Sequence, residues 1–246
     1  MGVRAEFVQQ DWSNLVPALA RGTFDVAMNG LEVTPSRADA VAFTRPYFIF
    51  SAQLVVRREE TAIARLADVR GHRVGTLANS MSWDLLVPTG AEAVSYEGVE
   101  EPYQDLASGR LDAVLLDDII ATRYGLVNPA LRLAEDSADG YYAVAARAED
   151  GALRDAVDEA IGRVAATGEL RRILARWNID SERQTRLEAW TADDTAALLR
   201  DRSHASFTLG HVRLFVEGAG VTLVVSTLGM TIAVLLGLML AIGRAY

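Results

Sequence analysis

Short apolar runs alternate along residues 1–180 with segments in which apolar side chains recur every three or four positions. The runs are typical of buried strands, and the recurring spacing is typical of amphipathic helices. We expect strands at 24–28, 41–43, 54–56, 72–77, 111–116 and 141–145, and helices at 12–20, 82–86, 103–108, 153–166 and 170–177. Strands and helices that alternate in this way predict an α/β architecture with largely parallel sheets.

The pattern changes twice after residue 180. Residues 181–212 mix acidic and basic side chains with few core-sized residues, which predicts a solvated, charged linker that is helical only around 196–199. Residues 218–243 then contain no charged side chain. Because about 20 apolar residues cross the hydrocarbon core of a bilayer, we expect one transmembrane α-helix within residues 213–246.

Small residues form a stripe along this predicted membrane helix. They recur every four positions, at Gly229, Ala233, Gly237 and Ala241. Such spacing is typical of membrane helices that pack closely against other helices. A simple single-pass anchor, which needs no such stripe, is the alternative.

The amino-acid composition argues against several classes of function. The chain has 33 acidic and 24 basic residues, for a net charge of −9, and an acidic body argues against nucleic acid as a partner. It has no cysteine, which excludes disulfides and thiolate metal sites. Its three histidines, His72, His204 and His211, are scattered. No acid/base pair, activated nucleophile or metal cluster is visible, so we expect neither an enzyme nor a cofactor.

The two ends of the chain suggest a piece of a longer polypeptide. The first residues lead directly into a strand-like alternation at 5–8, without a basic segment followed by an apolar stretch, so no export signal is visible. The charge-free run is followed by Arg244, close to the last residue. We therefore expect truncation at both ends.

Arg37 is the first candidate for contact with a small ligand. Thr34 is a natural N-cap and Pro35 a natural first helical residue, which places Arg37 in the first helical turn. A cation there opposes the helix dipole, unless an anion binds between the guanidinium and nearby backbone N–H groups. An anion site and an exposed arginine are both consistent with this spacing.

Asp117 and Ser80 are the next candidates. Asp117 follows the strand at 111–116, and ligands of open α/β sheets bind outside the carboxyl ends of strands. Its carboxylate could accept hydrogen bonds from an ammonium group, although a turn or cap role fits equally well. Ser80 follows the strand at 72–77 in a turn of small residues, where its hydroxyl and free N–H groups could meet a carboxylate. Most α/β turns look similar to this one.

Taken together, these segments resemble the family 3 extracellular solute-binding proteins, the polar amino-acid binding components of bacterial ABC importers. The motifs that carry the resemblance follow one another as Gly22-Thr23-Phe24-Asp25, Asn29-Gly30, Thr34-Pro35-Ser36-Arg37, Phe43-Thr44-Arg45-Pro46-Tyr47, Val74-Gly75-Thr76, Gly109-Arg110-Leu111-Asp112-Ala113-Val114, and Gly168-Glu169-Leu170 with Trp177. The resemblance spans residues 5–178 and implies a solute-binding domain at 1–180.

A second resemblance concerns the tail. Glu217-Gly218, with Thr222-Leu223 and Ser226, is similar to the start of the first transmembrane helix of the amino-acid permease subunit of the same importers. The chain therefore resembles fused binding-protein/permease polypeptides, with residues 213–246 as the start of a permease domain.

The resemblance implies a two-lobed periplasmic-binding-protein-like fold of type II, followed by the linker and one transmembrane α-helix. Lobe one would hold residues 1–54 and 145–180, and lobe two residues 55–144. Two crossing strands, near Ser51–Arg57 and Tyr141–Arg147, would join the lobes.

The same resemblance assigns roles in the cleft. The arginine of the Thr34–Arg37 motif, here Arg37, would clamp the ligand α-carboxylate with help from Ser80, and Asp117 would take the α-ammonium. Gly30 and Leu77 join the expected ligand-binding residues. This assignment is electrostatically complementary, since the Arg37 cation and the Asp117 anion would face the two charges of a zwitterion across a cleft.

Glu32 departs from the family pattern. It stands where the family usually has a serine or threonine that donates to the ligand carboxylate. It could pair with Arg37 or bind a ligand ammonium, and we hypothesise a preference for cationic amino acids. A second departure is that the opening strand and helix of the family have no counterpart in this chain.

The implied function is binding of a polar amino acid outside the membrane and its delivery to an ABC importer permease. The implied partners are an ABC ATPase subunit, further permease helices in a permease dimer, and membrane lipid. The expected location is the inner membrane, with the binding domain on the periplasmic side. The alternative is the ligand-binding domain of a membrane-anchored sensor or ligand-gated receptor, and the small-residue stripe favours the permease.

Overall fold

The computed structural model of the chain describes residues 3–200, 219–220, 222–223, 225–231, 233–234 and 244. The chain divides into two compact units, residues 1–203 and 204–246.

A six-stranded sheet runs through the first unit, in the order β1-β6-β2-β5-β3-β4. The strands are β1 Val26–Ala27, β2 Val41–Arg57, β3 Arg73–Leu77, β4 Glu92–Tyr96, β5 Ala113–Asp117 and β6 Leu131–Arg147. β3 pairs in parallel with β4 and β5, whereas β1 with β6, β2 with β5 and β2 with β6 are antiparallel. The expectation of a largely parallel sheet was wrong, because the two longest strands return beside each other in opposite directions.

The helices cover this sheet. The α-helices are α1 Leu15–Ala20, α2 Pro35–Ala38, α3 Met81–Leu86, α4 Glu101–Ala107, α5 Asp118–Ile120, α6 Gly151–Ala166, α7 Glu169–Arg176 and α8 Ala192–Arg200. Segments of 3₁₀-helix lie at Trp12–Asn14, Leu66–Asp68, Val87–Thr89 and Glu182–Ala189, and a π-helical turn lies at Ala121–Gly125. Gly168 separates α6 from α7 in a left-handed conformation with φ of 71°, which is the break that its position predicts.

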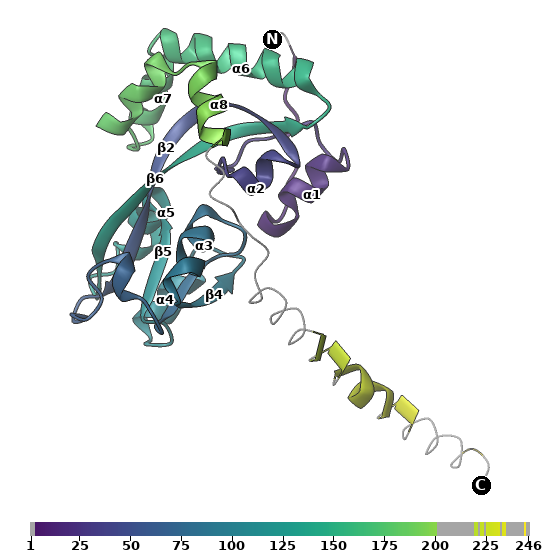
Figure 1. Cartoon of the computed structure of the whole chain (residues 1–246), viewed down its shortest axis with the longest axis vertical. Coiled ribbons are helices and arrows are strands. Elements are labelled where there is room, and N and C mark those ends of the chain that lie inside the picture. The colour runs from purple at the N-terminus through teal and green to yellow at the C-terminus, as the bar shows by residue number, and fades with distance from the viewer. Residues whose placement is uncertain are drawn as a thin grey trace. The chain divides into compact units, whose positions relative to one another are not determined.

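Strands β2 and β6 are the structural axis of the first unit. Each is 17 residues long, and they pair from Val41 with Arg147 to Arg57 with Leu131. Figure 1 shows them running together from the part that carries α1, α2 and α6 to the part that carries α3, α4 and β5. The apolar pattern predicted only fragments of these strands. The lobe boundaries at 54–55 and 144–145 fall inside them and stay a prediction.

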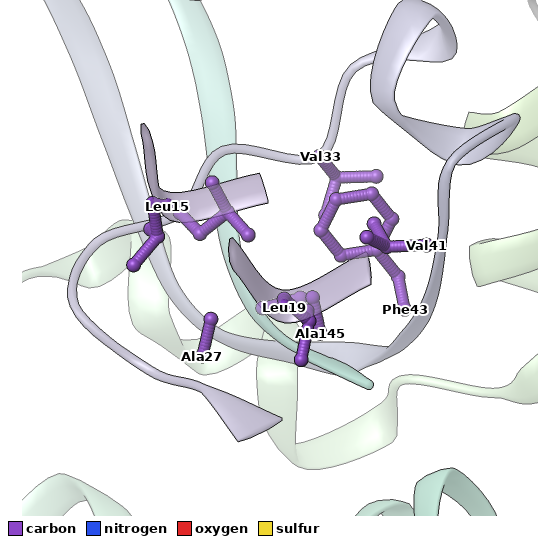
Figure 2. Packing of buried hydrophobic residues seen from close by; sticks show 9 residues of the cluster. Leu15, Leu19, Ala27, Val33, Val41, Phe43 and Ala145 are labelled. Atoms are coloured by element: carbon purple, nitrogen blue, oxygen red, sulfur yellow. The ribbon is translucent and has the colours of Figure 1, made fainter. Parts of the chain in front are cut away.

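Separate cores lie at the two ends of this axis. In one, Leu15 and Leu19 of α1 pack with Val41 and Phe43 of β2, and Figure 2 shows the Phe43 ring beside Val33. In the other, alternate residues of β5 enter two different clusters, with Ala113 and Leu115 in one and Val114 and Leu116 in the other. β5 is therefore buried on both faces, as its continuous apolar sequence requires.

Residues 182–200 differ from the solvated linker that we expected. Gln184 and Leu187 are buried, and the ring of Trp190 lies 5.1 Å from that of Tyr141. Gln184 Oε1 accepts from the Ile49 N–H at 3.0 Å, and its Nε2 donates to the Ile49 carbonyl at 2.7 Å. β5 pairs with β2 only from Ala52 onward. The Gln184 side chain therefore satisfies the backbone N–H and carbonyl of Ile49, which lies before the part of β2 that pairs with β5.

The second unit contains the predicted membrane helix, most of which lies outside the described residues. The described residues 219–220, 222–223, 225–231 and 233–234 are helical. Thr227 and Thr231 donate their hydroxyls to carbonyls four residues earlier, at 2.7 Å each. Among the residues that the structure describes, no helix has both the length and the apolar character needed to cross a bilayer. The transmembrane assignment of 213–246 therefore stays a prediction.

Substitution Gln184→Ala tests the docking of this segment. We expect the free energy of unfolding to fall by about 1–3 kcal/mol, because two buried backbone groups of Ile49 lose their partner. Urea denaturation of the full chain, followed by tryptophan fluorescence, measures this. Thr185→Ala, at an exposed position of the same segment, is the control and should stay within about 0.5 kcal/mol of the wild type. Equal effects of the two variants would contradict the docking role.

Candidate functional site

A cavity of about 380 Å³ lies among the strand ends and loops of the first unit. Aromatic and aliphatic side chains form most of its lining, from Trp12, Tyr47, Phe48, Leu116, Ile119, Ile120, Tyr142, Leu174 and Ile179. Five of the six predicted site residues also line it, namely Gly30, Glu32, Leu77, Ser80 and Asp117. Among the described residues, its charged lining groups are the carboxylates of Glu32 and Asp117.

Glu32 is buried at the edge of this cavity. It lies in the loop after β1, where a single bridge pairs it with Tyr142 of β6. Its Oε2 accepts hydrogen bonds from Arg37 Nη1 at 2.9 Å and from the Met81 backbone N–H at 2.9 Å. Burial raises the pKa of Glu32, and the nearby Arg37 charge and the Met81 N–H oppose that shift.

Arg37 pairs with Glu32 but does not line the cavity. Thr34 is extended and Pro35 opens α2, so Arg37 takes the helical position that the sequence predicted. Its Nη1 also donates to the Glu32 carbonyl at 3.0 Å, and its Nη2 donates to the Asn79 carbonyl at 2.6 Å. The guanidinium lies 4.9 Å from the centre of the Trp12 ring, a cation–π contact. Arg37 therefore borders a neighbouring pocket rather than the main cavity.

Asp117 is the last residue of β5 and is buried in the cavity wall. It precedes α5, but its side chain makes no capping hydrogen bond. Instead, the Tyr142 hydroxyl donates to its carboxylate. Burial and the neighbouring negative charge of Glu32 raise the pKa of Asp117 well above its usual range. Burial and the Asp117 charge likewise raise the pKa of Tyr142.

Ser80 and Gly30 are held by local contacts. The Ser80 hydroxyl donates to the Leu77 carbonyl at 2.8 Å and accepts from the Trp83 N–H at 3.1 Å, so it acts as the N-cap of α3. Gly30 has φ of 81°, and a Cβ there would lie 3.4 Å from the Tyr142 ring. Its N–H donates to the Tyr47 hydroxyl at 3.0 Å. Glycine thus permits both the turn and the close approach of Tyr142.

The sequence did not assign Trp12, Tyr47 or Tyr142 to the site. Trp12 begins the predicted helix at 12–20, and its indole Nε1 donates to the Ala78 carbonyl at 3.0 Å. Tyr47 and Tyr142 come from β2 and β6, and their ring centres lie 6.4 Å apart. Only the register of the two long strands brings these rings together, and no local pattern reports that register.

The residues that line the cavity determine which kind of ligand it favours. Two buried carboxylates face an apolar, aromatic space, and the adjacent Arg37 guanidinium already pairs with Glu32. A ligand with positive charge would relieve the cost of burying these acids. Among the described residues, no group of acids or histidines is arranged to hold a metal ion.

Comparison with known proteins identifies relatives of this chain. Residues 1–180 match the family described as bacterial extracellular solute-binding proteins, family 3. The chain is 26% identical over 185 residues to ABC transporter arginine-binding protein 1 of Escherichia coli (strain K12), covering 72% of this chain and 75% of that protein. It is 28% identical over 196 residues to the histidine-binding periplasmic protein of Salmonella typhimurium, covering 72% and 73%.

A solved structure shows the same architecture. An ancestral arginine-binding protein bound to arginine is similar with a TM-score of 0.66 and 29% identity, over 72% of this chain and 81% of that one. The fold is thus the α/β two-lobed fold of periplasmic binding proteins, as the sequence predicted.

Asp117→Asn tests whether the buried charge of Asp117 lowers the free energy of unfolding. Because the folded pKa of Asp117 is raised above its ordinary value of 3.8, the folded protein binds more protons than the unfolded chain between these two values. The free energy of unfolding therefore falls as pH rises through that window. We expect Asp117→Asn to be more stable than the wild type at pH 7, with a difference that vanishes as pH approaches 3.8.

Urea denaturation across this pH range measures the difference. Asp155→Asn is the matched control, because the Asp155 side chain is 68% exposed on α6, and its effect on the free energy of unfolding should stay within about 1 kcal/mol. An Asp117→Asn effect that is constant with pH would contradict the raised pKa.

Proposed function

This chain belongs to family 3 of the bacterial extracellular solute-binding proteins, and we propose that it binds a polar amino acid with a cationic side chain. The observation that carries the proposal is the pair of buried carboxylates, Glu32 and Asp117, in the wall of an otherwise apolar cavity. An arginine-binding and a histidine-binding protein among its relatives support the same class of ligand.

In the proposed complex, each charged group of the ligand has a partner. Asp117 takes the α-ammonium group, and Tyr142 keeps that carboxylate oriented through its hydroxyl. Arg37 and the Met81 N–H, which now share one oxygen of Glu32, take the α-carboxylate. Gly30, Leu77 and Ser80 shape the wall around the ligand backbone, and the aromatic rings lie against a cationic side chain.

Closure of the two lobes completes the site. Hydrogen bonds beside the cavity join predicted lobe one to predicted lobe two, among them those from Trp12 to Ala78, from Arg37 to Asn79, and from Met81 to Glu32. The long strands β2 and β6 pass between the lobes and provide the natural hinge. Closure excludes water, and both ligand charges then interact with their partners in a less polar surrounding.

We further propose that the bound amino acid is passed to an ABC importer permease, with an ABC ATPase subunit supplying energy. The charge-free run at 218–243 and its stripe of small residues support a first permease helix that packs against other helices in a permease dimer. In this arrangement the binding domain works on the periplasmic side of the inner membrane, tethered by residues 213–246.

A ligand panel tests the proposed specificity. We expect isothermal calorimetry on the full chain in detergent to show tighter binding of arginine and histidine than of glutamate. Arg37→Gln should weaken arginine binding about 30-fold or more, because loss of one partner of a buried charge pair costs about 2 kcal/mol or more.

Arg65→Gln is the matched control for the loss of an arginine. The Arg65 side chain is 69% exposed and pairs with Asp68, so its removal should leave the affinity unchanged. Tighter binding of glutamate than of arginine would contradict the cationic preference.

Membrane retention tests the tether. We expect the full chain to stay in the membrane fraction after alkaline extraction, and the double substitution Leu228→Arg with Met230→Arg to release it. Each arginine near the middle of the bilayer costs about 2.5–3.5 kcal/mol for insertion. Leu228→Ala with Met230→Ala is the control and should remain bound. Extraction of the unsubstituted chain would contradict the transmembrane assignment.

A further inference from the structure

We propose that Glu32 is a built-in competitor of the ligand, whose own carboxylate occupies the place of the ligand α-carboxylate and must be displaced before an amino acid binds. We define the carboxylate subsite as Arg37 Nη1 and the Met81 backbone N–H. The inference rests on the proposed function and deepens it, because it explains how the site selects a cationic amino acid.

The geometry of Glu32 is that of a bound carboxylate. One oxygen, Oε2, accepts from both groups of the carboxylate subsite at 2.9 Å each. The guanidinium belongs to predicted lobe one and the N–H to predicted lobe two. Glu32 therefore bridges the lobes through the same donors that would hold an amino acid.

The donors of the carboxylate subsite are already in use. Arg37 Nη1 has two N–H groups, and the Glu32 carboxylate and the Glu32 carbonyl accept from them. Arg37 Nη2 is held by the Asn79 carbonyl. A ligand carboxylate can therefore reach Arg37 Nη1 only when the Glu32 carboxylate leaves it.

An ordinary structural ion pair looks different in this molecule. Arg45 and Asp158 pair at 2.8 Å, and both belong to predicted lobe one. Neither of them lines the cavity, and their side chains are about one quarter exposed, at 24% and 23%. Glu32, by contrast, is buried, lines the cavity and contacts both predicted lobes.

Displacement gives Glu32 a second partner. Glu32 lines the cavity, so rotation of its side chain away from Arg37 would bring the carboxylate toward the space where a ligand side chain would lie. The two roles that the sequence left open for Glu32, pairing with Arg37 and binding a ligand cation, are then two positions of one carboxylate.

The balance of charges in the site explains why displacement of Glu32 favours a cationic ligand. With arginine bound, the carboxylates of Glu32, Asp117 and the ligand face three cations, namely Arg37, the α-ammonium and the ligand guanidinium. With a neutral amino acid, the same three carboxylates face only two cations. One buried acid then has no partner, and such a charge is costly.

The carboxylate subsite can be tested with acetate, which is a carboxylate without an amine. We expect acetate to raise the thermal unfolding midpoint of Glu32→Ala in a concentration-dependent manner, because it binds the folded state at the emptied subsite. The wild type and the double variant Glu32→Ala with Arg37→Gln should show no such rise. Absence of the rise in folded Glu32→Ala would overturn the proposal.

Displacement is tested with arginine and glutamine as ligands. In Glu32→Gln, which keeps the size of the side chain, we expect the ratio of arginine to glutamine affinity to fall at least about tenfold, which is 1.4 kcal/mol. Glutamine should bind more tightly than to the wild type. Asp84→Asn is the control, because Asp84 also interacts electrostatically with Arg37 but does not line the cavity, and its ratio should be unchanged.

The outcomes separate this inference from the proposed function. An unchanged ratio in Glu32→Gln overturns displacement, even where acetate binds to Glu32→Ala. If the wild type binds neither amino acid, the proposed function fails, and the acetate measurement alone still decides whether Glu32 occupies a carboxylate subsite. If Glu32→Ala does not fold, the ratio measured with Glu32→Gln decides.

Discussion

The buried ion pair between Glu32 and Arg37 is the interaction on which the site depends. Burial of a carboxylate and a guanidinium costs free energy unless hydrogen bonds satisfy both. Here the Met81 N–H and the Asn79 carbonyl complete the pair, and both belong to the predicted lobe opposite. The pair therefore closes the edge of the cavity and connects the lobes at once. Any ligand that uses Arg37 must replace part of this network.

The two long strands make that network possible. Their antiparallel pairing extends over the full length of β2 and β6, from Val41 with Arg147 to Arg57 with Leu131, so it aligns residues that are far apart in the chain. Tyr47 of β2 meets Tyr142 of β6, and Tyr142 in turn reaches Asp117 at the end of β5. The same strands connect the two cores, so they set the position of the cavity and would guide the lobe closure proposed above.

Much of the scaffold could be predicted from local patterns. The helix of α6, strand β3 and the break at Gly168 follow from apolar spacing and from glycine conformation. Five predicted site residues line the cavity because strand ends gather there in open α/β folds. The continuity of β2 and β6 could not be predicted, since Pro46 shifts the register of β2 and the acidic residues at 135–139 break the apolar pattern of β6.

The orientation of Arg37 depends on a contact that no spacing reports. Its guanidinium donates to the carbonyl of Asn79, which adopts a left-handed conformation with φ of 56°. Two acids with raised pKa values then share a cavity whose nearest cation is already paired. The folded protein carries the resulting electrostatic cost at neutral pH, and a ligand that brings its own positive charge would relieve it. In the proposed function, binding energy would come from relief of that cost as well as from new contacts, and selectivity for a cation would follow from the same two carboxylates.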